Sequence, residues 1–328
     1  MSRPMRKILL LLLTMHLVGA AAASPATHAV PVHRVRFAFH NAFLMNLHHF
    51  LYDMAVHKDK LQGLAWGSAP SEDEMRVLRG AVDFYRSNYA KLDLLDDATM
   101  VGIRHALSVD DARRTAAGLP LSPALAQVLD AVAPVYARTL WSIHENSNRA
   151  WIAQARALDT VFGAEIQAGI EGHMGAAFPR TPIRDDVVFN TGTRQGAYTD
   201  EQTVMPSDRA DYQGLAALEM LYHEASHTTV TVPLEQAIAA RMEASGRKGE
   251  SDLWHVAQFY TVGAVTRDVL ARRARLDYQP YADKRGLYSG YWAPLAPVVE
   301  SVWRAHMDGK ISLQEAAKGM VDRLPPSL

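Results

Sequence analysis

The stretch LEMLYHEASHTTV, residues 218–230, carries two histidines four positions apart, with a glutamate directly after the first. Apolar residues recur around it at helical spacing, which predicts a helix over about residues 211–229 with the pattern in its middle. Residues four apart on a helix project from the same face, one turn apart. His223 and His227 are therefore placed to bind a single metal ion, for which imidazole nitrogens are common ligands.

Glu224 points about 100° away from His223 around the same helix. From there its carboxylate is poorly placed to bind the same ion, but it can reach a water on that ion. We expect Glu224 to be a general base, which takes a proton from the water as the water attacks a carbonyl carbon. The alternative is a buried helix whose histidines are hydrogen-bonded core residues, because a chance match to this short motif is expected on the order of a few per cent of the time.

The stretch resembles the active-site helix of the zincin metallopeptidases over about twenty residues around His223 and His227. The resemblance implies that the two histidines bind one Zn²⁺ ion and that Glu224 is the catalytic base. It also implies that an edge strand upstream of the helix holds a peptide substrate. No single zincin family is indicated, since TTVTVPLEQAI follows the motif in place of the glycine and third histidine of the metzincins.

A catalytic zinc usually has three protein ligands and one open position. For the third ligand we favour His255, which lies near the first turn of an apolar helix predicted in SDLWHVAQFY, after a gap of 27 residues beyond His227. Glu250 and Glu243 are the main alternatives, and Glu235 and Asp252 lie in the same region. Tyr260 is a candidate donor to a developing oxyanion, against the simpler interpretation of a core aromatic residue. Glu219, four residues before His223, is expected either to orient a ligand histidine or to solvate a helix end.

Other chemistries find less support in the sequence. An incomplete copy of the motif, HENSN at residues 144–148, has Asn148 where the second histidine would stand, and it predicts a polar face of a long helix that either packs or lines a cleft. A di-iron site would need a second E-x-x-H on another helix, and the chain has none. There is no cysteine for a thiol nucleophile and no glycine-rich phosphate loop. The net charge of −1 gives no basis for a nucleic-acid partner.

Hydrophobic periodicity predicts an α+β fold that is predominantly α-helical, with a small sheet before the histidine helix. Residues 33–39 alternate as a strand, and residues 186–205 indicate two strands around a turn at 191–196. Asn41 is expected to cap the first helix, Ser71 and Glu74 to form a capping box, and Pro134 to interrupt a helical region from Ser122 to about Gly172. The predicted single domain covers 24–328, with helical segments at 41–172, 211–229 and 234–328.

The first 23 residues have the pattern of a signal peptide: a basic start, an apolar run of about a dozen residues and a small-residue cleavage site before Ser24. An uncleaved membrane anchor is the alternative interpretation. No later segment approaches membrane-spanning length, so we expect a periplasmic or secreted protein with no stable membrane span after cleavage. The absence of cysteine excludes lipid attachment and disulfides. The sequence carries no signal that fixes an oligomeric state.

Taken together, these features predict an exported zinc-dependent hydrolase, most consistent with a metallopeptidase that acts on a peptide or protein substrate. The alternative is a non-catalytic exported protein that binds metal, or a helical interaction protein, in which the same helix has no hydrolytic role.

Overall fold

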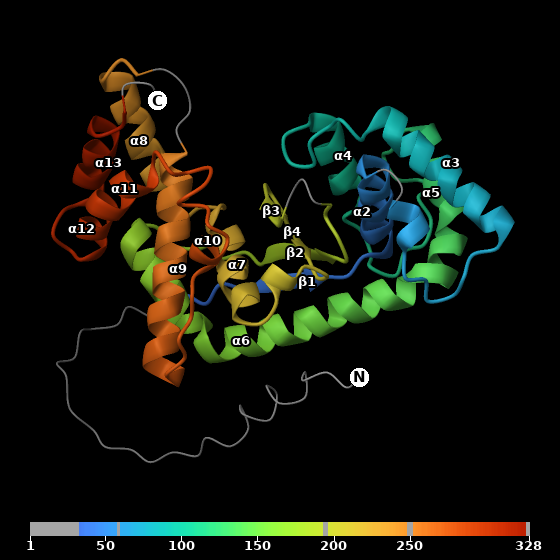
Figure 1. The fold of residues 1–328 in the computed structure, drawn as a ribbon, viewed down its shortest axis with the longest axis horizontal. Helices are drawn as coiled ribbons and strands as arrows, with labels where there is room; N and C mark the ends of the chain where they lie inside the picture. Colours follow the sequence, from blue (N-terminus) through green and yellow to red (C-terminus); the bar gives the residue numbers. More distant parts are fainter. Residues whose placement is uncertain (1–32, 58–59, 193–195, 248–251, 326–328) are drawn as a thin grey trace, which may run out of the picture. The chain divides into compact units, whose positions relative to one another are not determined.

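The computed structural model describes residues 33–57, 60–192, 196–247 and 252–325 (Figure 1). The predicted signal peptide and Glu250 lie outside these ranges. Contacts group the residues from His33 onward into one unit. No helix among the described residues combines the length and apolar character needed to cross a membrane. The predicted fold class is confirmed: the protein is predominantly α-helical and has one small sheet.

Four short strands form this sheet in the order β1–β2–β4–β3: β1 Phe37–His40, β2 Ile183–Val188, β3 Tyr198–Thr199 and β4 Thr203–Pro206. β1 pairs parallel with β2, and β2 pairs parallel with β4. Only β3 runs antiparallel, beside β4. The segment after the predicted turn at 191–196 forms two strands, of which β4 pairs directly with β2 and β3 lies beyond β4. β3 and β1 are the two edges of the sheet.

The two faces of the sheet pack against different helices because successive side chains of a strand point to opposite faces. Ile183, Val187 and Met205 belong to one core cluster with α6 (Ser142–Met174) and α7 (Leu215–Ser226). Val188 and Val204 belong to the second cluster with α2 (Phe43–Val56). The sheet thus separates two cores, and α7, which carries the histidine motif, lies on the α6 side.

Before the sheet, the chain is helical as predicted, with these helices after α2: α3 Glu72–Asn88, α4 Ala98–Leu107, α5 Pro123–Tyr136 and α6. The capping box at α3 is confirmed, since the backbone N–H of Ser71 donates to Glu74 Oε2 at 2.7 Å and Ser71 Oγ accepts from the Glu74 N–H. Asn41 is not the cap of α2, which begins at Phe43. Its backbone N–H donates to Asp111 instead, at 2.9 Å. Pro134 lies inside α5, which passes through a π-helical turn at 137–141 into α6.

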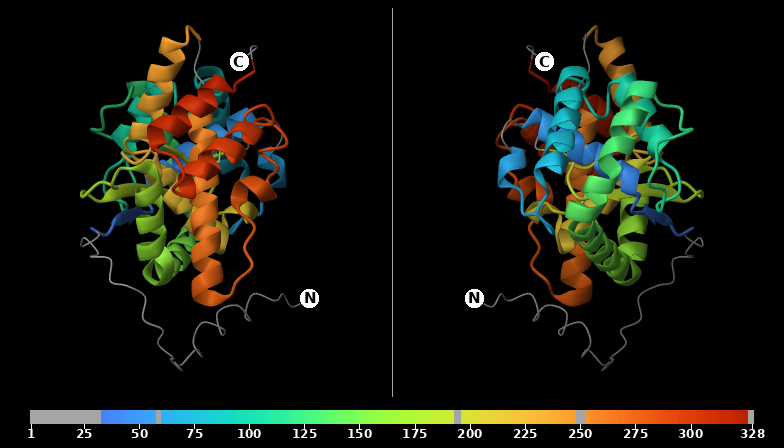
Figure 2. Two further views of the ribbon diagram at one scale, coloured as in Figure 1. Left: turned by 90° about the vertical axis from the view of Figure 1, so that its left-hand side faces the viewer. Right: turned by 90° about the vertical axis from the view of Figure 1, so that its right-hand side faces the viewer.

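After α7 the chain is again helical: α8 Val232–Ala244, α9 Leu253–Ala274, α10 Tyr281–Lys284, α11 Ala296–Val298, α12 Arg304–Met307 and α13 Leu313–Asp322. Figures 1 and 2 show α9 lying across the C-terminal half of α6. At this crossing, a Cβ atom on Gly169 of α6 would come within 2.7 Å of Val265 on α9, so the two helices approach each other closely. This packing places the start of α9 beside α7.

The incomplete motif on α6 is buried at His144 and Asn148 and connects α6 to neighbouring elements. The Asn148 side chain donates to Asn41 Oδ1 at 2.7 Å and to Asn46 Oδ1 at 2.9 Å, and it accepts from Ser207. The His144 ring stacks on Phe189 with centroids 4.0 Å apart. The polar face that the sequence predicts for this part of α6 thus ties the helix to α2 and to the end of β4, because buried polar groups need hydrogen-bond partners.

The long helix α6 supports both the sheet and α9, so its buried face should control the stability of the protein. Ile166 is fully buried in the core, while Val161 on the same helix is 47% exposed. We expect Ile166→Ala to lower the free energy of unfolding by about 2–5 kcal/mol, through lost burial and a cavity. Urea unfolding measures this, and Val161→Ala is the matched control, with a change within about 0.5 kcal/mol. Equal effects of the two substitutions would contradict this packing.

Candidate metal centre

The two histidines of the motif lie at the C-terminal end of α7, His223 in its last turn and His227 directly after it, and not in the middle of a longer helix as predicted. α7 ends at Ser226, and His227 follows it with helical dihedral angles, φ −63° and ψ −16°. The His227 N–H donates to the Glu224 carbonyl at 3.1 Å, which tightens the helix as it ends. The β-branched run from Thr228 onward follows directly. Because His227 keeps helical dihedral angles, the rings of His223 and His227 lie on the same side of the helix.

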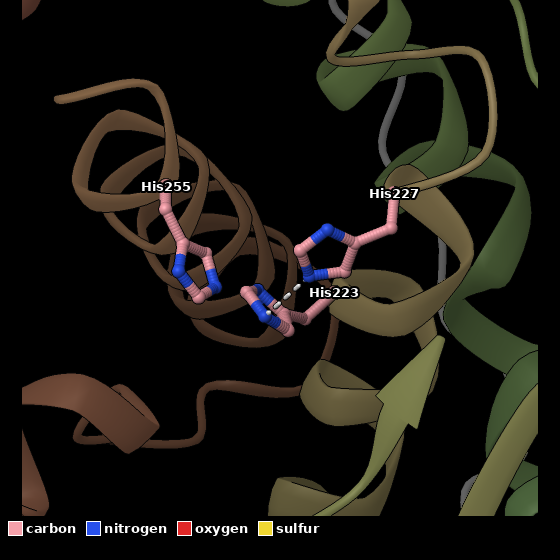
Figure 3. A group of neighbouring side chains, drawn as sticks. All are labelled: His223, His227 and His255. Carbon is pink, nitrogen blue, oxygen red and sulfur yellow. Dashed lines mark hydrogen bonds between the residues drawn. The ribbon is translucent and has the colours of Figure 1, made fainter. Parts of the chain in front are cut away.

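Helix α9 places His255 beside His223 and His227 (Figure 3). Figure 3 shows the ring of His255 facing the rings of His223 and His227 across the gap between the two helices. One ring nitrogen from each of the three histidines lies within 4.8 Å of the others. The Nε2 atoms of His223 and His227 are 3.3 Å apart. Of the candidate third ligands, His255 is thus the one that the described structure brings to the motif.

This arrangement fits a tetrahedral metal ion. Two nitrogens that each lie about 2.0–2.1 Å from a tetrahedral zinc are about 3.4 Å apart, close to the separation of the His223 and His227 atoms. The Nε2 atoms of His223 and His227 face each other, and a cation between the two rings would be bound by the lone pairs of both.

The protonation states favour metal binding as well. Burial, followed by the neighbouring His227 and His255, holds the pKa of His223 well below its ordinary value. Burial, with a smaller contribution from His255, lowers the pKa of His227 to about 3. Burial lowers the pKa of His255 to about 4, although Asp252 acts in the opposite direction. All three rings are therefore neutral near pH 7, the form in which imidazole donates a lone pair to a metal.

Aromatic side chains hold the three rings in position. Phe259, one helical turn after His255 on α9, stacks on His223 with ring centroids 3.7 Å apart. Trp254 stacks on His255 at 5.0 Å, and its ring also meets the edge of His227 at 5.6 Å. Trp292 contacts His255 edge-on at 5.1 Å. The ring orientations are thus set by packing, which restricts the rotamers that the histidines can adopt.

Gln258 fixes the two helices relative to each other. Its side-chain Nε2, fully buried, donates to the His223 carbonyl at 2.9 Å and to Ser226 Oγ at 2.6 Å. The carbonyls at the end of a helix lack backbone partners within the helix, and that of His223 accepts from the side chains of Ser226 on α7 and Gln258 on α9. Because Gln258 lies three residues after His255, the same contact sets the position of His255 relative to the motif.

Glu224 lies beside the three histidines and is not part of their group. It is 3% exposed, and its Oε2 accepts a hydrogen bond from Thr199 Oγ1 at 2.8 Å. Burial raises the pKa of Glu224 to about 7, while the bond from Thr199 acts to lower it. Thr199 lies on the edge strand β3 and also contacts Thr203 of β4, with 3.0 Å between their Oγ1 atoms. The carboxylate is thus oriented by the sheet.

The structure gives other roles to the remaining candidates. Tyr260 is hydrogen-bonded to Arg304 and belongs to the part-buried edge of the core, so the predicted contact with a reacting group has no support. Glu243 is exposed on α8, and Glu235 accepts a hydrogen bond from Thr231. Asp252 directly precedes α9, and its carboxylate accepts a hydrogen bond from Trp292 Nε1 at 3.2 Å instead of capping the helix. Among the described residues, only the three histidines form a group that could hold a metal.

Glu219 does not orient a ligand histidine. It is fully buried on α7, and its carboxylate accepts hydrogen bonds from the Tyr278 hydroxyl at 2.6 Å and from the Tyr281 N–H at 2.9 Å. These bonds hold the chain between α9 and α10 against α7. Nor does Glu219 solvate a helix end, the second role that the sequence allowed.

Several residues that shape the site were not predicted from the sequence. Gln258 and Phe259 follow His255 by three and four positions, so the helical spacing alone would have placed them on the same face of α9. Thr199 lies in the predicted strand region upstream of the motif. Trp292 had no local signal, because it is 37 residues from His255 and reaches it only through tertiary packing.

Removal of any one of the three histidines should weaken zinc binding. We expect His223→Ala, His227→Ala and His255→Ala each to reduce zinc affinity by more than about a hundredfold, beyond the 10–100-fold typical of changes outside the ligand set. Competition with a chromophoric chelator measures the affinity. His105→Ala, on α4, and Glu243→Gln are matched controls that should bind zinc as the parent does. Full affinity in His255→Ala would dismiss it as the third ligand.

Glu219 predicts a pH dependence of stability. Burial raises the pKa of Glu219 from 4.5 to about 7 in the folded protein, although the bonds from Tyr278 and Tyr281 oppose the shift. A raised carboxyl pKa gives stability that is present below the unfolded value and is lost as the pH rises through the folded value. The free energy of unfolding of Glu219→Gln, relative to that of the parent, should therefore increase by on the order of 2 kcal/mol between pH 5 and pH 8.

Urea unfolding of both proteins at several pH values measures this difference. The comparison with Glu219→Gln removes the contributions of other titrating groups, which both proteins share. A difference in stability between the two proteins that does not change between pH 5 and pH 8 would show that the carboxyl is ionised in both states.

Comparison with known proteins adds no family to these observations. No protein-family model matches the chain, and no curated protein or solved structure is significantly similar to it. The function of the protein is therefore inferred from the geometry and chemistry of the site itself.

Proposed function

We propose that the protein is an exported zinc-dependent hydrolase of zincin type that cleaves peptide bonds. The observation that carries the proposal is the meeting of three neutral imidazoles from α7 and α9 beside a buried carboxylate that stays outside their group. Export follows from the predicted signal peptide at residues 1–23. The separation of ligands from carboxylate supports hydrolysis over a purely structural metal site, which would have a closed set of four ligands.

His223, His227 and His255 would hold the ion. Imidazole ligands suit zinc, copper, iron and nickel, and we propose zinc because three histidines with an open position are typical of catalytic zinc sites. When bound in such a site, the ion lowers the pKa of a water molecule and polarises a carbonyl group. The chain supplies the orientation of the ligands, through the stacking of Phe259 and the hydrogen bonds of Gln258.

Glu224 would accept the proton of the attacking water and pass it to the leaving amine. Its Oε2 is occupied by Thr199, while its Oε1 has no hydrogen bond from the described residues and is the atom available for the proton. Burial disfavours the charged carboxylate, and this makes it a better proton acceptor than an exposed glutamate. Thr199 keeps the group pointing in one direction, which general base catalysis needs.

The edge strand β3 supports a peptide as the substrate. β3 is bonded to β4 on one side only, and it carries Thr199, the partner of Glu224. An extended peptide that added to this free edge would run past the carboxylate and the three histidines. Backbone pairing of this kind recognises the main chain of a substrate, with pockets for alternate side chains giving specificity.

Replacement of Glu224 tests the proposal. Glu224→Gln should lower kcat/KM for peptide hydrolysis by at least about a hundredfold, since general base catalysis typically contributes 10²–10⁴-fold. Zinc should still bind, because Glu224 is not a ligand. The assay is a panel of peptide and cell-wall substrates, with and without a chelator, and zinc is measured on the same samples. Glu219→Gln, a buried glutamate on the same helix, is the matched control and should keep most of the activity.

Two results would contradict the proposal. One is cleavage by Glu224→Gln at the parent rate, which would remove the carboxylate from the reaction. The other is stoichiometric zinc in the parent with no chelator-sensitive hydrolysis of any substrate in the panel, which would favour a non-catalytic metal-binding protein.

A further inference from the structure

A hollow lies at the opposite edge of the sheet, beside β1. It has a volume of about 500 Å³ and is bordered by Phe39 of β1, by the chain after α4, and by one face of the π-helical turn and α6. The residues that α6 and this turn contribute recur at helical spacing and include Trp141, Glu145, Arg149 and Arg156. Drug-sized ligands occupy cavities of about 300–1,000 Å³, so the volume is sufficient for a small molecule. None of these residues belongs to the metal centre.

The carboxylates at this hollow already have partners. Asp111 accepts a hydrogen bond from the His40 ring at 3.0 Å and another from the Asn41 N–H at 2.9 Å. Glu145 accepts from Arg149 at 2.7 Å. Both carboxylates at the hollow thus accept hydrogen bonds from residues that lie beside them.

Two of the arginines at the hollow, unlike Arg149, have no hydrogen-bond acceptor among the described residues, although the charge of Glu145 acts on Arg114. The guanidinium of Arg114 lies over the rings of Phe43 and Trp141, 4.1 and 5.1 Å from their centroids. The guanidinium of Arg156 lies over Phe39 at 5.3 Å. Neither guanidinium has a hydrogen bond or an ion pair with any part of the chain that the structure describes. Aromatic stacking holds a guanidinium in place while its N–H donors stay free for an anion.

Trp141 also lines the hollow, and its indole N–H lies beneath the surface. Its ring is 6% exposed, and its Nε1–H is buried without a hydrogen-bond partner among the described residues. Buried tryptophan N–H groups usually have an acceptor. Two guanidinium groups without hydrogen bonds from the described part of the chain and the ring of Trp141 thus border the hollow.

We propose that this hollow is a second binding site, for a small organic anion. A carboxylate or phosphate group would lie between the guanidinium groups of Arg114 and Arg156, whose fork of N–H donors matches the oxygens of either group. The apolar part of the ligand would pack on the side chains of Phe39 and Ile152, which also line the hollow. This site is independent of the metal centre and of the proposed hydrolysis.

Calorimetric titration tests the proposal with three probes at one ionic strength: benzoate, phenyl phosphate and benzamide, the neutral isostere of benzoate. We expect one-to-one binding of benzoate, phenyl phosphate or both, and at least tenfold weaker binding of benzamide, because hydrogen bonds to charged groups are worth about 1.5–3 kcal/mol. Binding of benzoate alone identifies a carboxylate site, and binding of phenyl phosphate alone identifies a phosphate site. Removal of zinc by a chelator should leave the affinity unchanged.

Arginine variants then locate the binding site. Arg114→Gln and Arg156→Gln should each weaken binding of the anionic probe by about tenfold or more. Arg76→Gln is the matched control, since Arg76 is exposed on α3 and pairs with Asp73 far from the hollow in sequence. Thermal unfolding checks that each variant is folded. If Arg114→Gln is unstable, Arg156→Gln still tests the proposal, because Arg156 is exposed on α6.

Three results would overturn the proposal. They are no binding of either anionic probe at millimolar concentrations, binding of benzamide as tight as that of benzoate, and binding of the anion to both arginine variants with the affinity of the parent.

Discussion

The candidate metal centre depends on the contact between the end of α7 and the start of α9. Gln258 donates to the carbonyl of His223 and to Ser226 Oγ, which itself donates to the same carbonyl, so one side chain of α9 joins the polar groups at the end of α7. Phe259 covers the ring of the same histidine. The interaction that completes the hydrogen bonding of one helix end therefore also decides where His255 lies. A shift of α9 would break the hydrogen bonds of Gln258 to the His223 carbonyl and to Ser226 Oγ, and it would separate the third imidazole from the other two.

The sheet supplies what the helices do not. Glu224 lies on the same turn of α7 as the histidines, yet its carboxylate is oriented by Thr199 from the edge strand β3. Burial has opposite effects on the two kinds of side chain, because it disfavours charge in each. It keeps the imidazoles neutral, so they can bind a cation, and it makes the carboxyl a stronger proton acceptor. Burial at one site thus favours both metal binding by the imidazoles and proton transfer to the carboxylate.

The two edges of the sheet present opposite chemistry. Near β3, neutral imidazoles offer lone pairs and favour a cation. Near β1, the guanidinium groups of Arg114 and Arg156 offer N–H donors while the acceptors around them are occupied, and this favours an anion. The long helix α6 supports the sheet and borders the hollow beside β1, so both sites rest on the same scaffold. The ligands that we propose for the two sites belong to different classes because the balance of donors and acceptors differs at each edge.

Features that depend on neighbours within one or two helical turns were determined by the sequence. The capping box at Ser71, the predominance of helix and the shared side of His223 and His227 follow from local hydrogen bonds and periodicity. Tertiary structure alone decided the rest. It inserted β4 between β2 and β3, and it selected His255 over Glu243. These outcomes depend on contacts between segments far apart in the chain, where packing of whole helices and strands outweighs any preference that a short stretch of sequence records.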